Sequence, residues 1–104
     1  MSNTRTRKTP DARSAEILAA AVKLAKRVGW RRLTRDAVAK AANVSTGLVS
    51  THFANMDKLR DEVMRSAVHD EILPLIAEGL TDGNRIARRA PQELRQRALH
   101  ALAS

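Results

Sequence analysis

The chain has 104 residues, enough for one small domain with a limited hydrophobic core. It carries 19 Lys and Arg against 11 Asp and Glu, a formal net charge of +8 that favours a polyanionic partner. The absence of cysteine excludes disulfides and thiolate metal sites and fits a reducing, cytoplasmic location. There is no apolar run of about 18 residues and no signal-peptide pattern, so we expect neither a membrane span nor secretion.

The composition predicts an all-α fold. Glycine and proline are sparse, at 4 and 3 residues, and no run of β-branched and aromatic residues resembles a strand. Trp30 and Phe53 are the aromatic residues, so the core must be built from Ala, Val, Leu and Ile. A core so poor in large side chains usually needs additional stabilisation, and we expect dimerisation to supply it.

The charge is unevenly distributed along the chain. Residues 1–35 contain ten Lys and Arg against two Asp and Glu, whereas residues 61–84 contain one Arg against six acids. Residues 85–104 are basic again, with five Arg and one Glu. The first part therefore suits a surface that faces phosphates, and the acidic middle does not.

Residues 1–10 are predicted to form a disordered basic arm, because they are polar, lack periodicity and end in Pro10. Arg5, Arg7 and Lys8 could follow phosphates or enter a minor groove. The alternative is a solvated tail with a purely non-specific electrostatic role.

The first helix is predicted from a cap at Asp11 or Ser14 to about Val28, where Gly29 ends it. Trp30 then packs as a core aromatic in the following bend. The apolar side chains on one face of this helix are Ile17, Ala21, Leu24 and Val28.

Residues 33–53 predict two short helices joined by a tight turn. Thr34 is placed to cap the first helix, and Asn43 can end it because Asn tolerates a left-handed backbone. Ser45 can cap the second helix, expected at about Thr46–His52. This arrangement predicts a helix-turn-helix, which places its second helix in the major groove of DNA.

The same stretch carries the pattern Leu-Thr-x-x-x-Val-Ala-x-x-Ala-x-Val-Ser-x-Gly-x-Val-x-x-x-Phe. It resembles the DNA-binding domain of the TetR family of transcriptional regulators, and the resemblance covers about residues 13–64. Ser50 and Met56 stand where family members usually carry Tyr and Lys, so Thr51, His52 and Lys58 could supply those phosphate contacts instead. The resemblance implies a three-helix DNA-binding domain followed by a fourth, long helix and, here, a short C-terminal helix.

Candidate DNA contacts follow from this resemblance and from side-chain chemistry, with double-stranded DNA as the partner. The residues expected to face bases are Thr46, Leu48, Ser50 and Thr51; Leu48 is either a thymine-methyl contact or core. The residues expected to contact phosphates are Arg31, Arg32, Arg35, Lys40, Gly47, His52 and Lys58. Arg35 has the strongest case because it opens the helix that crosses the backbone, and its alternative is a solvated surface charge.

A fourth helix is predicted to begin near Asn55 or Met56. Pro74 must kink or end this helix, and we favour a kink with helix resuming to about Leu80, because the apolar pattern continues past the proline. A turn follows at residues 81–84, then a short helical turn within 84–90. The last helix is expected from Pro91 to Leu102.

Residues 11–64 are therefore expected to form the DNA-binding domain, and residues 65–104 a helical extension that forms a homodimer. The alternative is a monomer in which the last helix packs on the first and fourth helices. The residues expected at the dimer interface are Ile72, Leu75, Ile76, Leu80, Leu94, Ala98 and Leu102.

TetR-like regulators typically continue into a larger domain that binds an inducer. Here only about one extra helix follows, which leaves no room for a pocket of a few hundred Å³ under several helices, so we expect no small-molecule inducer. We also expect no enzyme activity, cofactor or metal. The histidines are dispersed, Ser50 and His52 point apart on a helix, and no glycine-rich phosphate loop is present.

The leading hypothesis is a homodimeric transcriptional regulator, expected to act as a repressor of a palindromic operator. One alternative is a DNA-architectural or segregation protein with weak sequence preference. The other is a protein-interaction adaptor that acts on a DNA-bound machine through its acidic and C-terminal helices.

Overall fold

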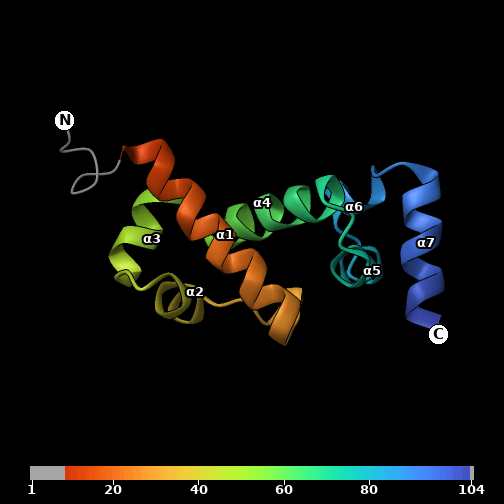
Figure 1. Ribbon diagram of the computed structural model, residues 1–104, viewed down its shortest axis with the longest axis horizontal. Helices are drawn as coiled ribbons and strands as arrows, with labels where there is room; N and C mark the ends of the chain where they lie inside the picture. Colours follow the sequence, from red (N-terminus) through yellow and green to blue (C-terminus); the bar gives the residue numbers. More distant parts are fainter. Residues whose placement is uncertain (1–8, 104) are drawn as a thin grey trace.

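The computed structural model describes residues 9–103, all of whose regular elements are helices, which confirms the all-α prediction. In chain order these are α1 (Pro10–Val28), η2 (Trp30–Arg32, a 3₁₀ turn), α2 (Arg35–Ala42), α3 (Thr46–His52), α4 (Met56–His69), α5 (Leu73–Thr81), α6 (Arg85–Arg88) and α7 (Gln92–Ala103). The molecule is elongated, with α2 and α3 at one end and α7 at the other (Figure 1). No helix within residues 9–103 is long and apolar enough to cross a membrane.

Helix α1 begins earlier than the sequence predicted. Thr9 caps it by accepting a hydrogen bond from the Ala12 backbone N–H at 3.1 Å, and Pro10 occupies the first turn. The predicted caps at Asp11 or Ser14 are therefore wrong, and residues 9 and 10 belong to the helix start instead of the arm. The physical reason is that proline at the first helical position loses no hydrogen bond and its φ is already helical. The remaining arm residues, Arg5, Arg7 and Lys8 among them, lie outside the described residues.

The inner face of α1 also differs slightly from the prediction. Val28 is 40% exposed, whereas Ile17, Ala21 and Leu24 are buried as predicted. Gly29 ends the helix as predicted, with φ of 106°, and the Trp30 side chain is buried in the bend that follows.

The helix-turn-helix forms with the predicted caps and bounds. The Thr34 hydroxyl accepts from the Ala37 N–H at 3.2 Å, and the Ser45 hydroxyl accepts from the Leu48 N–H at 3.1 Å. Asn43 adopts the left-handed conformation with φ of 59° between them. These caps satisfy N–H groups that have no partner within a helix and so fix where each helix starts.

The predicted kink at Pro74 is wrong, because α4 and α5 are separate helices. Helix α4 ends at His69, Glu71 turns the chain with φ of 57°, and the Ile72 N–H donates back to the Ala67 carbonyl at 2.8 Å. Pro74 then lies in the first turn of α5. There its missing N–H costs nothing, whereas in the middle of a helix it would break a hydrogen bond.

The hydrophobic core runs the length of the molecule. It begins at Leu33 and Val49 beneath the helix-turn-helix, continues through α1 and α4, and ends between α5 and α7. Gly79 on α5 allows the closest packing, since a Cβ there would lie 2.5 Å from the Met64 Cε atom and 2.8 Å from the Ala87 Cβ atom.

This packing changes the interpretation of the apolar residues after Ile72. The residues of the expected dimer interface that are buried within the single chain are Leu75, Ile76, Leu94 and Ala98. They are core residues and are not available to a partner, because α7 folds back onto α5. The monomer alternative, with α7 on α1 and α4, also differs from this arrangement.

Candidate nucleic-acid interface

Helix α3 presents a polar face that is free of the core. Val49 is its buried residue and anchors the helix, whereas Thr46, Ser50 and Thr51 are exposed. Thr46 and Ser50 are four residues apart and therefore share one face of the helix. The structure thus brings together three of the four residues expected to face bases.

The fourth residue, Leu48, is half-buried and packs against the core. Leu48 was expected to be either a thymine-methyl contact or a core residue, and its contacts support the core role.

Two features of α3 bear on how closely a nucleic acid could approach. The Thr51 hydroxyl donates to the Gly47 carbonyl at 2.9 Å, so its proton is engaged and its oxygen remains an acceptor. A Cβ on Gly47 would meet only the Ser45 Oγ atom at 3.8 Å. Nothing in the fold therefore requires glycine at position 47, and the missing side chain leaves space on the outer surface.

His52 ends α3 and ties it to α1. Its Nδ1 atom lies 2.7 Å from the Ser14 hydroxyl oxygen, and both residues are half-buried. Lys58 lines the same surface pocket as His52, so the structure brings these two candidate phosphate contacts together. Ser14 was not among the predicted site residues, and its 38-residue separation from His52 leaves no local sequence signal.

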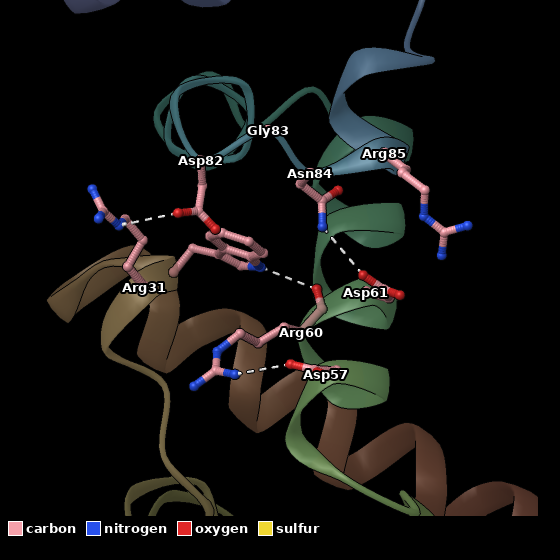
Figure 2. Close-up of a pocket in the computed structure, with 9 residues that line it drawn as sticks. Arg31, Asp57, Arg60, Asp61, Asp82, Gly83, Asn84 and Arg85 are labelled. Carbon is pink, nitrogen blue, oxygen red and sulfur yellow. Dashed lines mark hydrogen bonds and ion pairs between the residues drawn. The ribbon is translucent and has the colours of Figure 1, made fainter.

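The other candidate phosphate contacts divide into two groups. Arg35 at the first position of α2, Lys40 in its last turn and Arg32 just before it are exposed. Arg31 instead turns toward the end of α5, where its Nε atom lies 3.8 Å from the Asp82 Oδ1 atom (Figure 2). The structure therefore does not gather Arg31 with the α3 residues.

The turn between α1 and α2 is held by hydrogen bonds from other helices. The Trp30 indole Nε1–H donates to the Arg60 carbonyl at 3.0 Å, and the Arg60 Nη2 donates to the Leu33 carbonyl at 2.9 Å. The Glu78 carboxylate on α5 accepts from the backbone N–H groups of Trp30 and Arg31. Sequence reasoning missed Arg60 and Glu78, because both act across long sequence separations.

A polar pocket of about 470 Å³ adjoins this turn (Figure 2). Its lining residues are Trp30, Arg31, Asp57, Arg60, Asp61, Asp82, Gly83, Asn84 and Arg85. The pocket is a hollow that is open at the surface, so it does not test the expectation that no inducer pocket is enclosed under several helices.

The model of the family described as bacterial regulatory proteins, tetR family, matches residues 17–63. Residues 17–63 form a TetR-family DNA-binding domain. The match confirms the resemblance found over about residues 13–64, and a domain of this family implies a DNA-binding transcriptional regulator. No curated protein and no solved structure matches the chain.

The TetR family, to which this domain belongs, is a family of non-enzymatic regulators. Its match ends at Val63, within α4, so the second half of this helix and α5–α7 lie beyond the matched residues. The fold does not break at that point. The helix continues to His69, and α5 contacts α1, η2 and α4 of the TetR-family domain.

Proposed function

We propose that the protein is a transcriptional repressor that binds a palindromic operator as a homodimer, with α3 in the major groove. The observation that carries this proposal is that the hydroxyl side chains of α3, Thr46, Ser50 and Thr51, are exposed while Val49 anchors the helix in the core. Short hydroxyl side chains on the free face of a second helix-turn-helix helix suit hydrogen bonding to base edges.

The phosphate contacts are proposed to frame this helix. Basic side chains and exposed backbone N–H groups fix the register of a protein on DNA without reading its sequence. The proposed set consists of Arg32, Arg35, Lys40, Gly47, His52 and Lys58, with the basic residues Arg5, Arg7 and Lys8 adding non-specific attraction. Arg31 is left out because its guanidinium group faces Asp82.

The homodimer surface is proposed on the outer face of α7, at the end of the molecule opposite α3 (Figure 1). Leu99 and Leu102 are 48% and 63% exposed there, and they are two of the large apolar side chains that the described chain leaves in solvent. Ile72 and Leu80, which are only half-buried, would border this contact.

Repression is proposed to occur by occlusion of the promoter. Two half-sites about 34 Å apart would place both α3 helices on one side of the DNA, where a bound dimer excludes other proteins. We propose that changes in protein level or a partner protein, and not a small molecule, relieve binding.

Footprinting on a library of genomic fragments tests this function. A discrete protected palindrome is the expected result. Uniform protection of every fragment would instead indicate an architectural or segregation protein, and no protection would indicate an adaptor. Either of these two outcomes contradicts the proposal.

A further inference from the structure

The turn between α1 and α2 receives a cap from a helix outside the matched domain. The Glu78 Oε2 atom accepts from the Trp30 N–H at 3.0 Å, and the Oε1 atom accepts from the Arg31 N–H at 3.2 Å. These N–H groups lie at the start of η2, where no intrahelical carbonyl can accept from them. A single carboxylate on α5 therefore satisfies two consecutive donors that lie 47 and 48 residues earlier in the chain.

Gly29 makes this close contact possible. Its φ of 106° lies in the region that side chains with a Cβ rarely adopt. A Cβ at this position would also lie 3.3 Å from the Glu78 Oε1 atom, a tight approach. Both the backbone conformation and the space thus favour glycine opposite Glu78.

The same segment is held from its other side by α4. Arg60 donates to the Leu33 carbonyl at 2.9 Å, and Leu33 directly precedes Thr34, the cap of α2. Glu78 therefore fixes the beginning of the segment 29–33 and Arg60 fixes its end. The start of α2, and with it Arg35, is positioned by these two anchors.

We propose that Glu78 is a positioning residue for DNA binding: it holds the segment 29–33 so that α2 and α3 meet the DNA in one fixed orientation. The proposal rests on the function proposed above, since it assumes that α2 and α3 contact DNA. It also extends the functional DNA-binding unit through α5, beyond the matched residues 17–63.

Charge alone predicts the opposite effect of removing Glu78. Loss of an acidic side chain makes a DNA-binding protein more positive and tightens its binding to phosphates. The positioning role predicts weaker binding, because two N–H groups lose their acceptor and α2 loses its fixed start. The direction of the change therefore separates the two explanations.

The test compares two labelled duplexes, one carrying the palindrome recovered by footprinting and one of random sequence, by fluorescence anisotropy. We expect Glu78→Ala to weaken binding to the palindrome about tenfold and binding to the random duplex by less than about threefold. Glu78→Gln should fall between wild type and Glu78→Ala, because the amide oxygen can accept from one of the two N–H groups. The matched control is Glu71→Ala, which removes an exposed acid just before α5 that pairs with Arg97 instead of η2.

The ratio of the affinities for the palindrome and the random duplex distinguishes a positioning role of Glu78 from a purely structural one. Partial unfolding would weaken binding to both duplexes by the same factor, whereas misplaced helices lose sequence-specific contacts preferentially. The emission of Trp30, the single tryptophan, reports on the turn itself and should change in Glu78→Ala and not in Glu71→Ala. Titrations below the thermal midpoint of each variant keep the proteins folded.

Unchanged or tighter binding of Glu78→Ala, or an equal loss on both duplexes, would overturn this inference. The proposed function fails separately, if wild-type protein protects no discrete site. In that event, Trp30 emission in Glu78→Ala that matches wild type would still reject the positioning role, because it would show that the turn does not depend on Glu78.

Discussion

Helix α3 buries one of its 7 residues, Val49, whereas α5, with 9 residues, buries Leu75, Ile76, Ala77 and Gly79. Most side chains of α3 are therefore accessible to a partner, whereas α5 packs a broad face against the core. A helix as exposed as α3 gains little stability from its own packing. The comparison indicates that α3 depends for its stability on the helices packed against it, α1 and α2, whereas α5 contributes to stability through its own buried face.

The largest expected effect is at the buried end. Ile76→Asp should destabilise the folded chain by about 3–5 kcal/mol, because it places a carboxylate in a position that is 0% exposed. Thermal unfolding followed by circular dichroism measures this loss. A variant that melts like wild type but sediments as a smaller species would show that Ile76 lies at a dimer interface, as the sequence alone suggested.

A smaller effect is expected where α7 meets solvent. Leu102→Asp should leave the unfolding midpoint unchanged, because Leu102 is 63% exposed, and should weaken self-association by about 2 kcal/mol. Sedimentation equilibrium measures this change. Ala101→Asp, also exposed on α7, is the control for charge on this helix. Wild-type protein that sediments as a monomer at micromolar concentration would contradict the proposed dimer.

The two ends also differ in how far the sequence could predict them. The caps at Thr34 and Ser45 each bind an N–H three residues away, so their signal is local and both were predicted correctly. Pro74 is compatible with a kink or with a helix start, and packing of α5 decided between them. The apolar pattern after Ile72 could not distinguish a core from an interface, because periodicity shows that a face is covered and not what covers it.

The candidate site shows the same limit. Thr46, Ser50 and Thr51 were predicted to face bases from the family resemblance and from their side-chain chemistry, and the structure places them as exposed residues of α3. Glu78 was not predicted, because its partners lie 47 and 48 residues away and any acid of the 61–84 stretch could have filled the role. The family model supplied the function of the end that it covers and left α5–α7 undescribed.

At the exposed end, substitutions should change binding without changing stability. Ser50→Ala and Thr51→Ala should each weaken binding to the palindrome by about 1–2 kcal/mol and leave binding to random DNA nearly intact. Their unfolding midpoints should match wild type, since neither side chain is buried. Competition titrations with specific and random duplexes measure the difference, and equal losses on both would reject a base-facing role.

The smallest effect is expected from a single phosphate contact. Arg35 is exposed at the first position of α2, with its neighbour Asp36 in the same turn. If its guanidinium group binds one phosphate, Arg35→Ala releases one fewer counterion on binding, so the slope of log affinity against log salt becomes shallower by about one unit. Arg88→Ala removes the same charge from an exposed position on α6, far along the chain from α2, and should leave the slope unchanged. Equal slopes for the two variants would mean that Arg35 acts only through the net charge, and the phosphate contact would then have to come from another side chain of the helix-turn-helix end.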